Sequence, residues 1–229
     1  KTLRYVIVAI DGPAGSGKSS TARALANSTG FVYLDTGAMY RAVALRFLQL
    51  NVEATEENVG LVWENFSLDL SSSPEGMKVY MNGSDVSKEI RTPEVTAMSS
   101  RVSTLPEVRR RMVREQRRIA SSREKDGSGV IVEGRDIGTV VFPFASVKIF
   151  LDASPEVRVN RRMIDFQKEG HEVDRLELER DLLERDKRDK TRDISPLKKA
   201  VDAIVIDTTH LSLEEQILCI ESIIRERMN

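Results

Sequence analysis

Residues 5–19 read YVIVAIDGPAGSGKS, and this stretch decides the fold. Its first six residues form a continuous apolar and β-branched run, which is typical of a strand buried on both faces of a parallel sheet. A glycine-rich turn follows, and a segment with helical character then extends from Lys18 to about Ser28. This order of strand, turn and helix favours an α/β protein with a parallel sheet.

The turn in this stretch matches the phosphate-binding pattern G-x-x-x-x-G-K-[ST] in the strand-to-helix context that the pattern requires. Glycines allow several backbone N–H groups to point at one phosphate chain, and the helix N-terminus adds partial positive charge. Lys18 is expected to reach the β- and γ-phosphates of ATP, and the Ser19 hydroxyl to lie near Mg²⁺, directly or through water. The residues expected to bind ATP here are Gly12, Pro13, Ala14, Gly15, Ser16, Gly17, Lys18, Ser19 and Ser20.

The rest of the chain continues the α/β alternation. Further buried strands are predicted at residues 130–132, 147–151 and 203–206, with helical stretches between them. Residues 67–90 alternate apolar and polar positions and carry turn signals at Pro74-Glu75-Gly76 and Asn82-Gly83, which predicts a small antiparallel meander. Residues 156–192 are dense in charges of both signs, and Gly170-His171 interrupts them; on pattern alone they form a solvated helical hairpin with ion pairs.

Composition excludes several classes of function. The 35 basic and 36 acidic residues give a net charge of −1, so the protein is not expected to bind nucleic acid or membrane through its overall charge. The sequence has no secretory leader and no long apolar span, which predicts a cytoplasmic protein, and no segment suggests an obligate dimer, so we expect a monomer. The single cysteine, Cys219, is expected to pack in the core, and His171 and His210 to lie on the surface.

Three arginine-bearing segments, 35–41, 133–139 and 185–192, follow at positions expected to be loops or helix ends. Together with Lys18 they indicate phosphoryl transfer, because two phosphorylated substrates bring many negative charges together. The sequence lacks an Asn-Lys-x-Asp guanine motif, which argues against a GTPase. A kinase for another small acceptor, such as UMP or a metabolite alcohol, stays an alternative, as does a binding module that uses ATP as a switch.

The segments GPAGSGKSS, LDTGAMYR, EIRTPEV, VEGRDIGTVVFP, VKIFLDAS and ERDKRDKTRDISPL occur in the order in which they occur in bacterial cytidylate kinases. Over nearly its whole length the chain resembles that family of nucleoside monophosphate kinases. The resemblance implies a three-layer α/β/α P-loop fold with a parallel central sheet. It also implies a core of residues 1–35, 106–153 and 190–229, a monophosphate-binding insertion at 36–105 that holds a small antiparallel sheet, and a helical lid at 154–189.

The same resemblance implies that ATP is the phosphoryl donor, Mg²⁺ the cofactor, and CMP or dCMP the acceptor. By similarity the acceptor phosphate is held by Arg41, Arg135 and Arg192, in a pocket shaped by Thr36, Gly37 and Tyr40, and Gly134 also belongs to the residues that bind CMP. The sugar is contacted by Arg185 and Asp189, and cytosine by Ser100, Arg109 and Asp136. The lid arginines that close on ATP are Arg158, Arg161 and Arg162. The residues implied in catalysis are Lys18, Arg135, Arg161 and Arg192.

Some positions depart from the family pattern or have a plainer interpretation. Glu133 stands where several relatives have Asp, and Phe144 stands where an acidic or amide residue is common. On pattern alone Arg109 is a solvated helix residue, and only the resemblance gives it a role with the base. Thr104 and Glu107 are predicted to form a capping box at the start of its helix.

Overall fold

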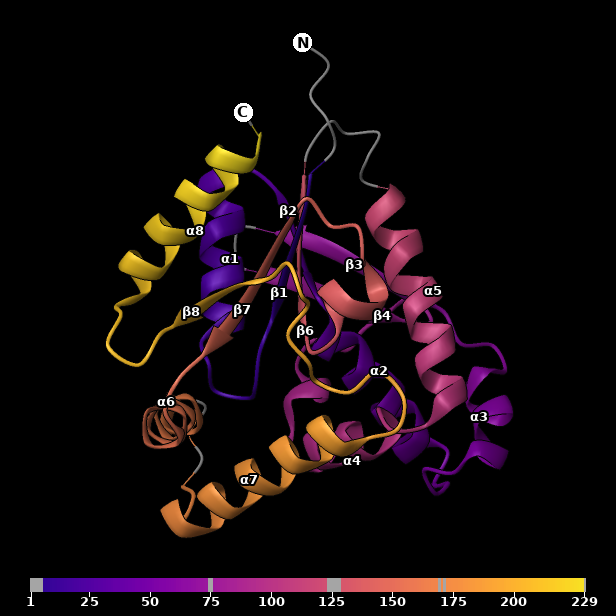
Figure 1. Cartoon of the computed structure of the whole chain (residues 1–229). Coiled ribbons are helices and arrows are strands. Elements are labelled where there is room, and N and C mark those ends of the chain that lie inside the picture. The colour runs from indigo at the N-terminus through magenta and orange to yellow at the C-terminus, as the bar shows by residue number, and fades with distance from the viewer. Residues whose placement is uncertain (1–5, 74–75, 123–128, 169, 171, 229) are drawn as a thin grey trace.

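Five parallel strands form the central sheet of the computed structural model, in the order β2-β6-β1-β7-β8 (Figure 1). The structure describes residues 6–73, 76–122, 129–168, 170 and 172–228. The strands are β1 (Ile7–Asp11), β2 (Val32–Asp35), β6 (Val130–Gly134), β7 (Val147–Asp152) and β8 (Ile204–Asp207). Because each neighbouring pair is parallel, the carboxyl ends of all these strands meet at one edge, where the following loops can form a site.

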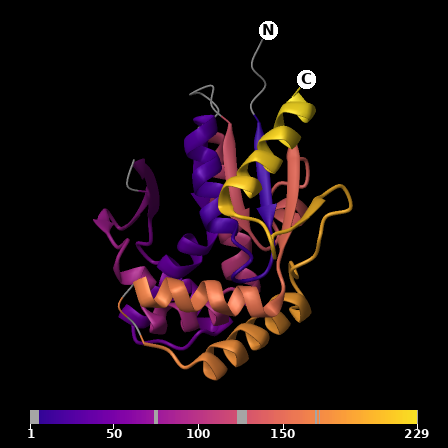
Figure 2. The same cartoon turned by 90° about the vertical axis from the view of Figure 1, so that its left-hand side faces the viewer.

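Helices cover both faces of this sheet, as Figures 1 and 2 show. Val8 and Ile10 of β1 point into one hydrophobic core and Ala9 into the other, because successive side chains of a strand face opposite sides. On the first face lie α1 (Lys18–Thr29) and α8 (Leu213–Met228), and on the second α2 (Thr36–Gln49) and α5 (Pro106–Ser122). The predicted three-layer α/β/α fold is confirmed.

The predicted antiparallel meander is also present. It consists of β3 (Leu68–Ser73), β4 (Gly76–Met81) and β5 (Ser84–Asp85). Asn82 and Gly83 both have positive φ, 52° and 80°, as a tight hairpin turn between twisted strands requires. The other predicted turn includes Pro74 and Glu75, which lie outside the described residues. The neighbouring helical elements are α3 (Glu56–Trp63), η1 (Glu89–Arg91) and α4 (Pro93–Val102).

The charged segment forms two helices, α6 (Pro155–Lys168) and α7 (Arg175–Thr191). They lie beyond the carboxyl ends of the central strands (Figure 2). A small apolar cluster joins Val159 of α6 with Leu178 and Leu182 of α7, and it includes Ala14 of the glycine-rich loop. The hairpin is therefore packed on the phosphate-binding loop and is more than a solvated appendage.

The prediction that Cys219 packs in the core is wrong, because its side chain is exposed. Helix α8 buries Gln216, Ile220 and Ile224, which are four residues apart and form one stripe along the helix. This stripe, flanked by the half-buried Ile217 and Ile223, faces the sheet and α1. The apolar neighbours of Cys219 suggested burial, but its own side chain lies outside the buried stripe.

The predicted capping box at the start of α5 is wrong as well. The Thr104 hydroxyl donates to the carbonyl oxygen of Arg101 (2.8 Å), and the Glu107 carboxylate pairs with Arg110 and Arg111 of its own helix. The Glu107 N–H donates to the Glu56 carboxylate of α3 (3.3 Å). A residue distant in sequence thus caps this helix, which a local pattern could not reveal.

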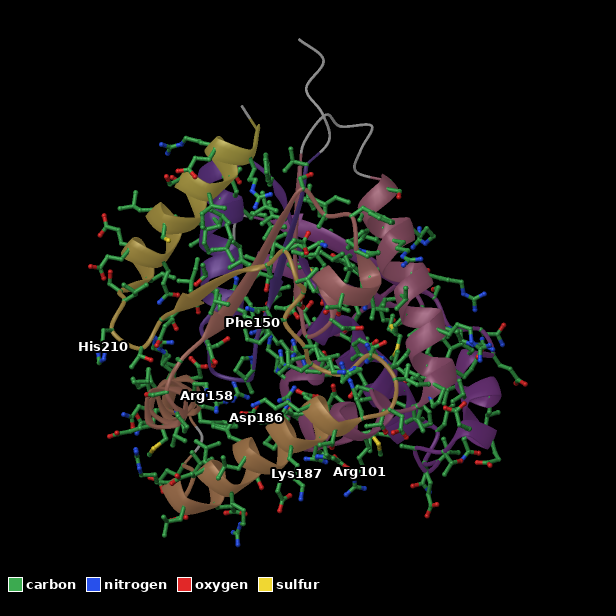
Figure 3. The ribbon with its side chains drawn as sticks, viewed as in Figure 1. Arg101, Phe150, Arg158, Asp186, Lys187 and His210 are labelled. Carbon is green, nitrogen blue, oxygen red and sulfur yellow. The ribbon has the colours of Figure 1, made fainter. Side chains whose placement is uncertain are left out.

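Among the residues that the structure describes, no helix has both the length and the apolar character needed to cross a bilayer. The same residues contain no group of three or more His, Cys, Asp or Glu side chains placed to hold a metal ion. His210 is exposed, as predicted, and is seen at the rim of the molecule in Figure 3. His171 lies outside the described residues.

Candidate active site

The glycine-rich loop lies between the carboxyl end of β1 and the start of α1. Gly12, Gly15 and Gly17 have φ of 152°, 74° and 92°, which residues with a side chain rarely adopt. A Cβ on Gly12 would lie 2.0 Å from the carbonyl oxygen of Leu151, so the close approach of β7 also requires glycine there. Gly17 is the N-cap of α1 and no side chain caps the helix, which leaves its first N–H groups for an anion.

Lys18 is buried, and its ammonium folds back over the loop. Its Nζ donates to the carbonyl oxygen of Pro13 (2.6 Å) and lies 3.4 Å from Ser16 Oγ. Burial, with the nearby Arg135 guanidinium, lowers the pKa of Lys18 to about 7. The ammonium is therefore poorly compensated in the free protein, and phosphate oxygens would supply the negative charge it lacks.

A hydroxyl and a carboxylate meet beside Lys18. Ser19 Oγ donates to Glu133 Oε2 (3.0 Å), and the Tyr33 hydroxyl donates to Glu133 Oε1 (2.5 Å). Burial and the neighbouring Asp35 raise the pKa of Glu133. These oxygen donors suit Mg²⁺, which binds carboxylates and hydroxyls next to a phosphate chain. Ser20, the second serine of the motif, is exposed in the first turn of α1.

The arginines expected around the acceptor phosphate come from three elements. Arg41 of α2 pairs with Asp35, the N-cap of the same helix (3.1 Å). Arg135 follows β6, and its Nε donates to Asp189 Oδ2 of α7 (2.9 Å). Arg192, which directly follows α7, lies 3.7 Å from the same carboxylate. One carboxylate on α7 thus holds two of these guanidinium groups close together.

Arg185, one turn before Asp189 on α7, completes this group. Burial and the nearby Arg135 lower its pKa to about 10. Like charges are kept this close where an anion compensates them, so an anionic ligand fits this cluster.

A second, more enclosed group lies deeper in the molecule. Arg109 of α5 is 2% exposed and Asp136 is 4% exposed, and Arg109 Nη2 donates to Asp136 Oδ2. The Tyr40 ring stacks near this guanidinium, 5.6 Å from ring centre to Cζ, and Arg192 lies 3.8 Å from Asp136. The structure therefore brings together Arg109, Asp136 and Tyr40, which the sequence alone could not connect.

Several buried polar atoms near this group have no hydrogen-bond partner in the part of the chain that the structure describes. Ser100 Oγ, Arg109 Nε and Arg192 Nη2 are enclosed, yet none has a hydrogen-bond partner among the described residues. Buried donors and acceptors are normally satisfied, because leaving one unpaired costs about 1–3 kcal/mol. Together with the Asp136 carboxylate they form a set of donors and an acceptor that suits a planar polar ligand.

The remaining acceptor-side residues shape the backbone around these groups. The Thr36 hydroxyl donates to the carbonyl oxygen of Glu133 (2.7 Å), which joins the start of α2 to the end of β6. A Cβ on Gly134 would lie 2.7 Å from Thr36 Oγ1, so glycine is needed for this approach. Gly37 is in the first turn of α2, where its Cβ would meet Asp35 Oδ1 at 3.1 Å.

The three arginines of α6 differ in their surroundings. Arg158 is buried and donates to the carbonyl oxygen of Ala14 in the glycine-rich loop. Arg161 donates to both oxygens of Thr208, and the Thr208 hydroxyl in turn donates to the Ser16 carbonyl oxygen. Arg162 pairs with Asp165 of its own helix (3.6 Å). Arg158 and Arg161 are thus linked to the phosphate-binding loop.

A family model described as cytidylate kinase matches residues 8–227. The chain belongs to the cytidylate kinase family. It is 48% identical to a cytidylate kinase of Carboxydothermus hydrogenoformans over 209 residues, which covers 91% of this chain and 92% of that protein. It is 46% identical to a cytidylate kinase of Lactobacillus johnsonii over 229 residues, 99% of this chain and 97% of the relative.

Among solved structures, the chain is similar in fold to an uncharacterized protein from Eubacterium ventriosum. The two chains are 15% identical with a TM-score of 0.51, over 97% of this chain and 99% of the other. At that identity a shared fold carries no inference about activity. Membership of the cytidylate kinase family therefore rests on the sequence matches.

Asp11, the last residue of β1, has a structural role that the sequence did not predict. Its buried carboxylate accepts the N–H groups of Ile137 (2.8 Å) and Gly138 (2.7 Å), at the start of the π-helical turn η3 (Ile137–Val141). Burial raises the pKa of Asp11 to about 6, although these two N–H groups act to lower it. Asp11 thus anchors the backbone directly after Asp136. The only signal in the sequence was an acidic residue after a buried apolar run.

Proposed function

We propose that this chain transfers the γ-phosphoryl group of ATP to CMP or dCMP, giving ADP and CDP or dCDP. The observation that carries the proposal is the enclosed Arg109–Asp136 pair. Ser103 links Ser100 to this pair, because its hydroxyl donates to the Ser100 carbonyl oxygen and its own carbonyl oxygen accepts from Arg109, and the buried Ser100 hydroxyl has no hydrogen-bond partner among the described residues. Cytosine offers an exocyclic amine donor next to the N3 and O2 acceptors. A carboxylate facing an arginine and a hydroxyl complements that edge, whereas uracil would leave the carboxylate without a donor.

The proposed acceptor site continues from the base toward the glycine-rich loop. Arg41, Arg135 and Arg192 would hold the CMP phosphate, with Thr36, Gly37, Tyr40 and Gly134 shaping the pocket. Arg185 and Asp189 would contact the sugar. The buried like charges of Arg135 and Arg185 support this assignment, because a phosphate would relieve the repulsion that lowers the pKa of Arg185.

On the donor side, the glycine-rich loop would cradle the triphosphate, with Ser19 and Glu133 near Mg²⁺. When bound, Mg²⁺ neutralises charge on the β- and γ-phosphates. Lys18, Arg135, Arg161 and Arg192 would stabilise the charge that develops on the transferring group. No general base is needed, because a phosphate oxygen of CMP is already a nucleophile, so transfer is direct and in line.

Residues 154–189 would act as the lid and residues 36–105 as the monophosphate-binding insertion around the core. Arg158, Arg161 and Arg162 of the lid would close on ATP. Closure excludes water, which otherwise competes as an acceptor and wastes ATP. The hydrogen bond of Arg158 to the glycine-rich loop, and the link of Arg161 to the same loop through Thr208, support this arrangement.

The test is an ADP-release assay with ATP, Mg²⁺ and each of CMP, dCMP, UMP, AMP and GMP in turn, with an acceptor-free reaction as control. We expect fast turnover with CMP and dCMP only. Turnover with another acceptor would refute the assignment of Arg109 and Asp136 to cytosine. If none of the five acceptors supported turnover although ATP binds, the kinase proposal would be overturned. Slow hydrolysis that no acceptor accelerates would favour the nucleotide switch instead.

ATP binding is expected to take up a proton above pH 7. The pKa of Lys18 is lowered to about 7 in the free protein, so at pH 8 most molecules carry a neutral amine. The triphosphate would raise that pKa again, and uptake should approach about one proton at pH 8 and fall toward zero at pH 6. Calorimetry in buffers of different ionisation enthalpy measures it.

The matched control for this titration is Lys18→Arg, whose guanidinium keeps a cation and does not titrate in this range. The variant should bind ATP without the pH-dependent uptake. Equal uptake in both proteins at pH 8 would assign the proton to another group and refute the role of Lys18.

A further inference from the structure

Helix α7 carries a buried carboxylate that the proposed substrate contacts do not use. Asp186 is 6% exposed and accepts a hydrogen bond from Arg158 Nη1 of α6 (2.5 Å). The same Nη1 donates to the carbonyl oxygen of Ala14 (3.1 Å). Figure 3 shows Arg158 and Asp186 side by side between the two helices. One guanidinium nitrogen thus connects the glycine-rich loop with α7.

Asp186 lies on the same helix as two residues that are proposed to contact the acceptor. Its neighbour in sequence is Arg185, and Asp189 lies three residues on, where its carboxylate holds Arg135 (2.9 Å). A movement of α7 that displaces Asp186 therefore also displaces the residues proposed to contact the acceptor. Because α7 is one continuous helix over Arg175–Thr191, such a movement shifts these side chains together.

The contact with the loop is tight enough to transmit a displacement. A Cβ added to Gly15 would lie 2.8 Å from the Arg158 carbonyl oxygen, so α6 packs directly on the loop. Arg158 Nε and Asp186 Oδ1 are buried and have no hydrogen-bond partner among the described residues. The guanidinium therefore keeps a free donor for a phosphate oxygen while Nη1 stays on Asp186.

We propose that Asp186 is a positioning residue that couples the two substrate sites. It holds Arg158 against the glycine-rich loop, so that a triphosphate in the loop fixes α7 in the position that binds the acceptor, and the acceptor fixes Arg158 for the triphosphate. The inference rests on the proposed function for the identity of the two ligands. By linkage, each nucleotide then increases the affinity for the other by the same factor.

The experiment measures CMP binding by calorimetry with and without a non-hydrolysable ATP analogue and Mg²⁺, and the reciprocal titration. In the unaltered protein we expect the analogue to tighten CMP binding by roughly fivefold or more. In Asp186→Asn the factor should fall below about twofold, while CMP alone binds within about threefold of the original affinity. Asp181→Asn, an exposed position on the same helix, is the control and should keep the full factor.

A second variant covers the case in which Asp186→Asn does not fold. Arg158→Lys keeps a cation near Asp186 but has one nitrogen in place of the guanidinium, so it lacks the separate Nε donor that would bind a phosphate oxygen while Nη1 stays on Asp186, and it should also reduce the coupling factor. An unchanged factor in a folded Asp186→Asn or Arg158→Lys, or no coupling in the unaltered protein although both nucleotides bind, would overturn the inference. Failure of the unaltered protein to bind CMP at all would instead overturn the proposed acceptor.

Discussion

Lys18→Ala is expected to reduce turnover by about 10³-fold or more without loss of the fold. The rate falls because the variant lacks the cation that would bridge the β- and γ-phosphates as charge develops. Stability should be retained, because burial lowers the pKa of Lys18 and the folded protein therefore holds the charged form at a cost. The ammonium donates its hydrogen bonds within its own loop, to the Pro13 carbonyl oxygen and to Ser16 Oγ.

Steady-state kinetics with ATP and CMP measures the first effect, and urea unfolding of both proteins measures the second. Lys187→Ala is a suitable control, since Lys187 is exposed on α7 and the variant removes the same charge. It should keep nearly full activity. Residual activity of Lys18→Ala above about a tenth of the original would be incompatible with a cation that stabilises the transition state.

The sequence predicted four of the five central strands because each is a short, mostly apolar run, interrupted only by Lys148 in β7. It missed β2, since Val32–Asp35 is short and contains a tyrosine whose hydroxyl reaches Glu133. The predicted strands also ended one or two residues early. In the structure β1, β7 and β8 continue to an aspartate, because the backbone there still pairs with the neighbouring strand although the side chain is polar.

The candidate site also has one part that the sequence predicted and another that it did not. The glycine-rich loop was predictable because its turn, its helix N-terminus and Lys18 are contiguous in sequence. The links that hold the rest together are not, since Asp11 reaches Ile137 and Arg158 reaches Asp186 across long separations. A single sequence shows that charges exist at these positions, but their partners depend on how the helices pack. Resemblance to a family supplied roles for single residues and gave no role to Asp11 or Asp186.

Asp136→Asn is expected to lower kcat/KM for CMP by about 10²-fold or more and to bring the values for CMP and UMP close together. The carboxylate accepts the amine of cytosine in the proposed site, while an amide can also donate to the O4 of uracil. The change leaves the Arg109 guanidinium, which is 2% exposed, with a neutral partner. Breaking such a buried pair costs about 3–5 kcal/mol, so the variant should also unfold at lower urea concentration.

Selectivity must therefore be separated from stability. The ratio of kcat/KM for CMP to that for UMP is insensitive to the fraction of folded enzyme, because both substrates meet the same population. Asp193→Asn, which removes a charge from an exposed position next to Arg192, should leave this ratio unchanged. If Asp136→Asn lost activity toward both acceptors in equal proportion, Asp136 would be a structural partner of Arg109, and the base would be read elsewhere. A selective loss toward CMP would tie discrimination to this one carboxylate.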